Sequence, residues 1–246
     1  MRNPRSARKG KGFTLVELLV VISIIALLVA IILPAISDAL FRGKLTASAA
    51  NGRSIHQSVF AQETENIYST VSSAWPKSPV KAGTYDVAYQ SSNQYLYDLV
   101  TNETLRVSWN FFTAPGVPVA PDAAQFQNNG TFCAWSITAD FRDSTPDTMP
   151  FLFTRNFDPG TQFNQSIYSP GEAGRSTALK EDATPFGDKG MVFVTKAGSA
   201  FAPFKKDLLI KVGTEDRFQS LFNIILPSGA GAVEYADNQV LRPSNY

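Results

Sequence analysis

The sequence predicts an α+β fold in which one long N-terminal α-helix packs on an antiparallel β-sheet. Two observations predict it. A charge-free apolar run, followed by apolar residues at helical spacing, fills most of the first 65 residues. Short β-branched and aromatic runs, separated by turns rich in Gly and Pro, follow it. At 246 residues and 44% hydrophobic, the chain is typical of one or two ordinary domains and not of a disordered protein.

The apolar run from Leu18 to Ser37 carries no charge over twenty residues. As a helix it would be about 30 Å long, which matches the hydrocarbon core of a bilayer. Every charge that precedes Phe13 is positive: Arg2, Arg5, Arg8, Lys9 and Lys11. By the positive-inside rule, this basic head predicts a cytoplasmic N-terminus and a chain that continues on the far side of the membrane.

Two ordinary explanations of this segment are a secretory signal peptide and a plain membrane anchor. A signal peptide has an apolar core of about 7–15 residues, which is shorter than this run, and the "PAIS" that follows is a weak cleavage match. A plain anchor accounts for the length but leaves Glu17 unexplained, since a carboxylate at mid-membrane costs roughly 2.5–3.5 kcal/mol.

The stretch "KGFTLVELLVVISIIALLVAIILPA" resembles the class III signal of type IV pilins and of the pseudopilins of type II secretion. The resemblance covers about residues 8–40. Gly12 matches the residue before the cut, Phe13 the new N-terminus, and Glu17 the carboxylate five residues after the Gly. Pro34 stands where many family members have a helix-kinking proline.

This resemblance implies that a prepilin peptidase removes the basic leader, residues 1–12, and methylates the new amine of Phe13. A glycine at the cut suits a narrow protease cleft, because it has no side chain. It also implies a role for Glu17, which would pair with the amine of a neighbouring helix and set the depth of an incoming subunit. The alternative is that Glu17 lies near headgroups and stabilises its own helix N-terminus.

We expect one helix from about Phe13 to about Gln62, with residues 13–37 in the membrane and residues 38–65 as an amphipathic continuation. Pro34 removes one backbone hydrogen bond and should kink the helix. Gly43 and Gly52 should weaken it. The residues expected to form its apolar stripe are Ile36, Leu40, Leu45, Ile55, Val59 and Phe60.

Residues 66–246 are expected to form the head domain. We expect a loop over 72–86, a short helix over 94–101, strands within 130–141 and 149–157, and an irregular excursion over 156–188. The clearest hairpin turns at Lys196-Ala197-Gly198 within 189–204. Residues 216–226 have helical spacing, and the last twenty residues read as extended or loose.

Few residues of the head suggest a metal site or a catalytic site. Asp140, Asp143 and Asp147 could supply oxygen ligands for calcium, but without EF-hand spacing they more simply cap turns. Cys133 is expected to be a buried thiol and His56 a packing residue, although the two could nominally form a catalytic dyad. Asn102, Asn129 and Asn164 begin N-x-Ser/Thr triplets, which we interpret as chance matches.

The net charge of +1, with only Lys205, Lys206 and Lys211 in "PFKKDLLIK", gives no basis for nucleic-acid binding. With no phosphate loop, no GxSxG and no paired Cys motif, we expect no enzyme and no cofactor.

The resemblance to pilins and pseudopilins therefore implies a filament subunit of the bacterial inner membrane, with a cytoplasmic N-terminus and a periplasmic head. Its expected partners are the prepilin peptidase, related pilin subunits, the inner-membrane assembly platform and membrane lipid. A type II secretion pseudopilin is favoured over a minor type IV pilin, because the lone Cys lacks the paired cysteines of many pilins. A membrane-tethered binding module or enzyme is the alternative of another class.

Overall fold

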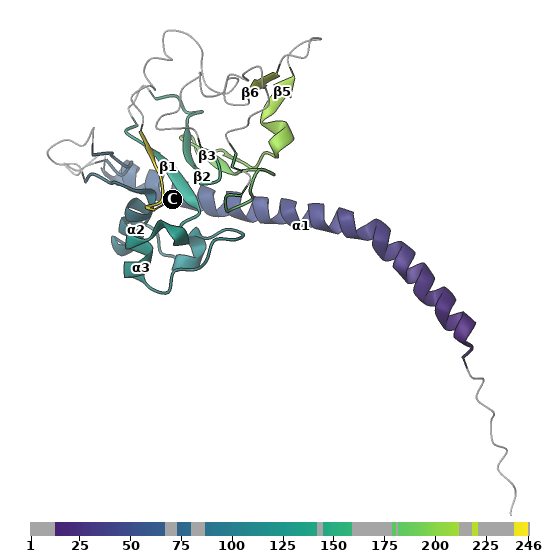
Figure 1. Cartoon of the computed structure of the whole chain (residues 1–246). Coiled ribbons are helices and arrows are strands. Elements are labelled where there is room, and N and C mark those ends of the chain that lie inside the picture. The colour runs from purple at the N-terminus through teal and green to yellow at the C-terminus, as the bar shows by residue number, and fades with distance from the viewer. Residues whose placement is uncertain are drawn as a thin grey trace, which may run out of the picture. The chain divides into compact units, whose positions relative to one another are not determined.

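Figure 1 shows a computed structural model of the chain. The structure describes residues 13–66, 73–79, 87–141, 145–158, 179–180, 182–211, 218–220 and 239–245. The chain divides into two compact units, Met1–Gly43 and Lys44–Tyr246. The leader, including Gly12, lies outside the described residues.

Helix α1, Leu15–Asn66, runs without a break through both units. Its 52 residues confirm the long helix expected from the sequence, and its ends lie within a few residues of those predicted. Pro34 stands inside the helix. Having no N–H, Pro34 leaves one carbonyl of the preceding turn without its usual helical donor.

The second unit contains a five-stranded antiparallel sheet in the order β4-β3-β2-β1-β7 (Figure 1). Its strands are β1 Trp135–Ala139, β2 Pro150–Thr154, β3 Phe193–Thr195, β4 Ala200–Phe201 and β7 Gln239–Leu241. A separate antiparallel pair consists of β5 Leu209–Lys211 and β6 Phe218–Ser220. The α+β fold predicted from the sequence is therefore the fold observed.

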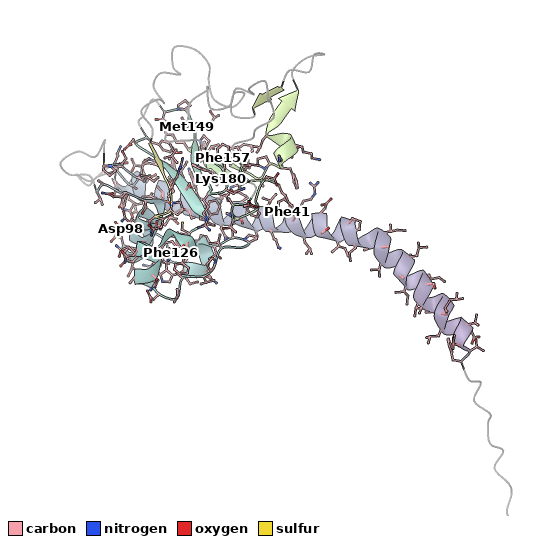
Figure 2. All side chains as sticks on the ribbon, in the orientation of Figure 1. Phe41, Asp98, Phe126, Met149, Phe157 and Lys180 are labelled. Carbon is pink, nitrogen blue, oxygen red and sulfur yellow. The ribbon has the colours of Figure 1, made fainter. Side chains whose placement is uncertain are left out.

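The second unit also contains short helices. Helix α2, Ser92–Thr101, lies beside α3, Ala123–Asn128. Three 3₁₀ turns complete the described helical elements: Trp109–Phe112, Gly130–Phe132 and Lys205–Asp207. Phe126 of α3, labelled in Figure 2, is fully buried. It packs on Trp109 and Phe112, with ring centroids 4.9 and 5.1 Å away.

The C-terminal part of α1 packs on the sheet through one stripe of its surface. The buried stripe comprises Leu45, Ser48, Gly52, Ile55, His56 and Val59. Leu45, Ile55 and Val59 were expected in this stripe, but the expectation for Phe60 was wrong, since 56% of that residue is exposed. Ile36 and Leu40 lie in the first unit, where they are exposed.

Gly52 allows the helix to come close to the sheet. A Cβ at this position would lie 2.9 Å from Cγ2 of Val194 and 3.1 Å from the ring of Trp135. The glycine that was expected only to weaken the helix therefore sets the distance between α1 and the strands β1 and β3.

A buried arginine fastens the segment after β2. The Arg155 guanidinium donates to the carbonyls of Gly130, Cys133 and Thr184, each at 2.9 Å, and also to the hydroxyl of Thr184. Only 5% of this residue is exposed. Because carbonyls from two separate parts of the chain, the turn at 130–133 and Thr184, meet at one planar cation, Arg155 ties both segments to the sheet.

The strands expected within 130–141 and 149–157, the helix at 94–101 and the hairpin at 196–198 are confirmed. The helix expected over 216–226 is wrong at Phe218–Ser220, which forms strand β6. Apolar spacing there fits either structure, and pairing with β5 favours the strand. Most of the 156–188 excursion and most of the C-terminal tail lie outside the described residues.

Candidate functional site

The candidate site is the start of α1, where Glu17 forms a capping box with Thr14. The backbone N–H and the hydroxyl of Thr14 each donate to Oε2 of Glu17 at 2.8 Å. In return, the backbone N–H of Glu17 donates to the Thr14 hydroxyl at 3.2 Å. This reciprocal pair satisfies two donors that a helix N-terminus otherwise leaves free, so the local sequence Thr-x-x-Glu starts the helix.

Thr14 is the functional residue that the sequence reasoning missed. The signal was present, because Ser or Thr followed three residues later by Glu, just before an apolar run, is a recognisable helix start. The capping box supports the alternative in which Glu17 stabilises its own helix N-terminus. It engages only Oε2, so Oε1 of Glu17 makes no hydrogen bond to the described residues.

Phe13, one residue before the capping box, is 74% exposed. The apolar side chains from Leu15 to Ile36 project on all sides of the helix and are exposed within the single chain (Figure 2). Of the described helices, only α1 is long and apolar enough to cross a membrane. Helices in lipid bury such surface against acyl chains or other helices.

Hydroxyls within the apolar segment are satisfied by the helix itself. The Ser23 hydroxyl donates to the carbonyl of Leu19 at 2.8 Å, and the Ser37 hydroxyl donates to the carbonyl of Pro34 at 2.9 Å. The segment therefore presents no unsatisfied side-chain donor to lipid at these positions, as membrane burial requires. The bend expected at Pro34 stays a prediction.

His56 and Cys133 have separate partners and structural surroundings. Nε2 of His56 lies 2.6 Å from the carbonyl oxygen of Lys196, and its ring packs on Trp75 and Phe151. Cys133 is fully buried, and its thiol lies 3.5 Å from the carbonyl oxygen of Trp135. Burial raises the pKa of the Cys133 thiol to about 11, so it stays protonated and unreactive.

The aspartates considered for calcium have different environments. Asp140 is buried, and its two carboxylate oxygens accept from the backbone N–H and the hydroxyl of Ser78 at 2.8 and 2.6 Å. Asp147 is exposed, and Asp143 lies outside the described residues. Among the described residues, no group of three acidic, His or Cys side chains could hold a metal ion.

Comparison with protein families finds a match at the N-terminal end of the chain, where Thr14 and Glu17 lie. Residues 7–33 match the model of the prokaryotic N-terminal methylation motif, and the matched range includes Phe13, Thr14 and Glu17. No curated protein and no solved structure matches the chain. With its capping box and its exposed apolar helix, the N-terminal region is the prepilin-type signal of the type IV pilin and pseudopilin family.

Proposed function

We propose that this protein is a structural subunit of a helical filament assembled from the bacterial inner membrane, and specifically a type II secretion pseudopilin. The observation that carries the proposal of a prepilin-processed subunit is the N-terminal methylation motif over residues 7–33. The choice of a pseudopilin rests on the lone Cys133. In this role a prepilin peptidase cuts between Gly12 and Phe13 and methylates the new amine. The apolar helix stays on the mature chain, and no catalytic group or cofactor is required of the head.

The geometry at Glu17 suits such a subunit in two states. Before assembly, Thr14 supplies two hydrogen bonds to one carboxylate oxygen, which lowers the cost of an ionised group at the membrane edge. During assembly, the other carboxylate oxygen accepts a hydrogen bond from the N-terminal amine of Phe13 in a neighbouring subunit. An ion pair is stronger in lipid than in water, so this contact sets the register between subunits.

The proposed location in the cell follows from the basic leader and the apolar helix. The basic leader keeps the N-terminus in the cytoplasm, α1 spans the inner membrane once, and the head lies in the periplasm. The partners are the peptidase, related subunits, an assembly platform in the same membrane, and lipid. The alternative within the family is a minor type IV pilin.

The first experiment is to determine the N-terminus of the protein purified from its native membrane, by intact mass and N-terminal sequencing. A chain that begins at methylated Phe13 supports the proposal. A chain that begins at Met1 would indicate an ordinary anchor. A chain that begins after Ser37 would indicate a discarded signal peptide and would overturn the filament role.

The second experiment separates a filament subunit from a tethered module. Single cysteines introduced along the exposed apolar part of α1 should give dimer cross-links in the assembled filament. The native Cys133 should not cross-link, because it is buried. Glu17→Ala should abolish these cross-links, whereas Asp38→Ala, on the same helix, should retain them. Equal cross-linking in both variants would refute the assembly role of Glu17.

A further inference from the structure

A cleft of about 250 Å³ lies in the second unit, far along the chain from the prepilin signal. Its walls come from the last turns of α1, which contribute Gln62 and Asn66, and from α2 with the residues that follow it. The segment from Ser73 to Lys77 and the residue Tyr89 close the remaining side. All residues that line the cleft are among those the structure describes.

Hydrogen bonds within the walls hold this cleft open. Nε2 of Gln62 donates to Oδ1 of Asn66 at 3.1 Å, and the Thr104 hydroxyl donates to Oε1 of Gln62 at 3.4 Å. The Tyr95 hydroxyl donates to the carbonyl of Ala74 at 2.9 Å. Because both walls are fixed before any ligand arrives, binding would need little reorganisation.

The lining has no net charge, which excludes strongly charged ligands. It contains one cation and one anion, Lys77 and Asp98. The Lys77 ammonium donates to the carbonyl of Phe141 at 3.3 Å, and Asp98 is hydrogen-bonded to the phenol of Tyr89. Burial raises the pKa of Tyr89 and the Asp98 carboxylate raises it further, so the phenol stays protonated as the donor. A phosphate or a divalent cation would find no unopposed charge here.

The lining combines two kinds of surface, one aromatic and one polar. The ring of Tyr89 packs edge-on against that of Tyr95, with centroids 5.1 Å apart, and supplies an aromatic wall. Asn102, at the end of α2, is exposed, and its side-chain amide makes no hydrogen bond to the described residues. A planar amide offers both a donor and an acceptor, which is what adjacent hydroxyl groups require.

From this arrangement we infer that the cleft binds a neutral sugar residue, whose C–H face lies on Tyr89 and whose hydroxyls bond to Asn102 and Asp98. A sugar ring combines an apolar face with a rim of hydroxyls and matches the small volume. A peptide strand fits less well, because the extended residues at the wall, Lys77 and Ala88, already pair with each other. This inference goes beyond the filament role and does not depend on it.

The test is saturation-transfer NMR on the full-length protein in a detergent that has no sugar headgroup. The probes are free glucose, galactose and N-acetylglucosamine, added one at a time. Asn102→Ala and Tyr89→Ala remove the polar and the aromatic contact, respectively. Gln57→Ala, an exposed amide of α1 outside the cleft, is the matched control. Near-UV circular dichroism verifies that each variant is folded.

We expect at least one of the three sugars to bind, with a Kd on the order of millimolar because one ring offers few contacts. Binding should weaken at least about tenfold in Asn102→Ala and Tyr89→Ala and stay unchanged in Gln57→Ala. If Tyr89→Ala fails to fold, Asn102→Ala decides alone, since that residue is exposed. The absence of saturation transfer for all three sugars, or unchanged binding in Asn102→Ala, would overturn the inference.

Discussion

At the scale of single residues, the pair Thr14 and Glu17 shows how one carboxylate can serve a helix and an assembly contact at different times. Its Oε2 belongs to the capping box of α1. Its Oε1 is left for the amine that we propose it meets in a filament. The two roles described for Glu17 at the outset are therefore compatible, because they use different oxygens.

We expect Thr14→Val to loosen the start of α1. The substitution removes the hydroxyl that accepts from the Glu17 N–H and donates to its carboxylate. Loss of such a cap costs about 1 kcal/mol, so amide hydrogen exchange at Glu17 in detergent micelles should quicken by about fivefold.

Thr14→Ser is the matched control, because serine keeps the hydroxyl and should retain the wild-type exchange rate. Wild-type exchange at Glu17 in the valine variant would show that the capping box does not stabilise the helix.

His56 is the second residue whose environment has a measurable consequence. It is the only histidine of the chain, and only 5% of it is exposed. Burial lowers the pKa of His56, and the hydrogen bond to the Lys196 carbonyl only partly opposes this. Gly198, whose φ is +83°, lies against the ring: a Cβ at that position would stand 2.8 Å from the imidazole, so only glycine fits beside His56.

We expect the folded head to lose stability as the pH falls through the range below about 6.5, the ordinary pKa of histidine. In that range the unfolded chain binds the proton more readily than the folded chain, because the folded-state pKa is lower. The free energy of unfolding therefore falls on acidification and is highest above that range.

Urea denaturation at a series of pH values, followed by circular dichroism, measures this dependence. His56→Gln keeps a hydrogen-bond donor but does not titrate, so its stability should vary less between about pH 5 and about pH 7. Identical pH profiles for the two proteins would contradict the assignment.

At the scale of elements, the contact between α1 and the sheet depends on glycine at one position and not at another. Gly52 lies against Val194, Trp135 and Leu152 of three adjacent strands. Gly43, nine residues earlier on the same helix, has nothing within 4 Å of the position of a Cβ. The same residue type is thus required for close packing in one place and is only a weak helix former in the other.

We expect Gly52→Ala to destabilise the protein by about 1 kcal/mol. Alanine gains nearly 1 kcal/mol in helix propensity, but overpacking against the stiff side chain of Val194 costs about 1–3 kcal/mol. Gly43→Ala gains the propensity without the clash and should not lower stability. The midpoints of urea denaturation compare the two variants, and equal midpoints would show that the sheet tolerates the added methyl.

At the scale of the whole molecule, the chain is two compact units that share one helix. Every buried apolar residue among those described lies at or after Leu45, within the second unit. In the first unit, the described residues from Phe13 to Leu40 are all exposed, and Phe41 is half-buried. The second unit therefore has a core of its own, and the first depends on lipid or on other helices for burial.

We expect residues 44–246 alone to fold and to stay in solution without detergent. The fragment keeps the stripe of α1 that packs on the sheet, from Leu45 to Val59, and lacks the apolar run. Its thermal unfolding should be cooperative and occur within a few degrees of that of the head in the full chain, as measured by circular dichroism and size-exclusion chromatography. An aggregated or unfolded fragment would show that the first unit stabilises the second.

Local features of the sequence were enough to predict much of the fold. The prepilin-type signal is read from residues within a few positions of one another, and its match over residues 7–33 is confirmed. Helix α1 and the β3–β4 hairpin follow from apolar spacing and from a turn at Gly198, which again are local. At 216–226 the apolar spacing fitted either a helix or a strand. Pairing of β6 with β5 favoured the strand, whereas a helix had been predicted.

The sequence by itself determined the apolar anchor, the prepilin-type signal and the α+β class, because each is encoded in the order of neighbouring residues. Only the tertiary structure decided that Gly52 spaces a helix from a sheet, that His56 is held by the Lys196 carbonyl, and that Arg155 joins the turn at 130–133 to Thr184. Those contacts join residues far apart in the chain. Their strength comes from burial and from the exclusion of water, which no local pattern specifies.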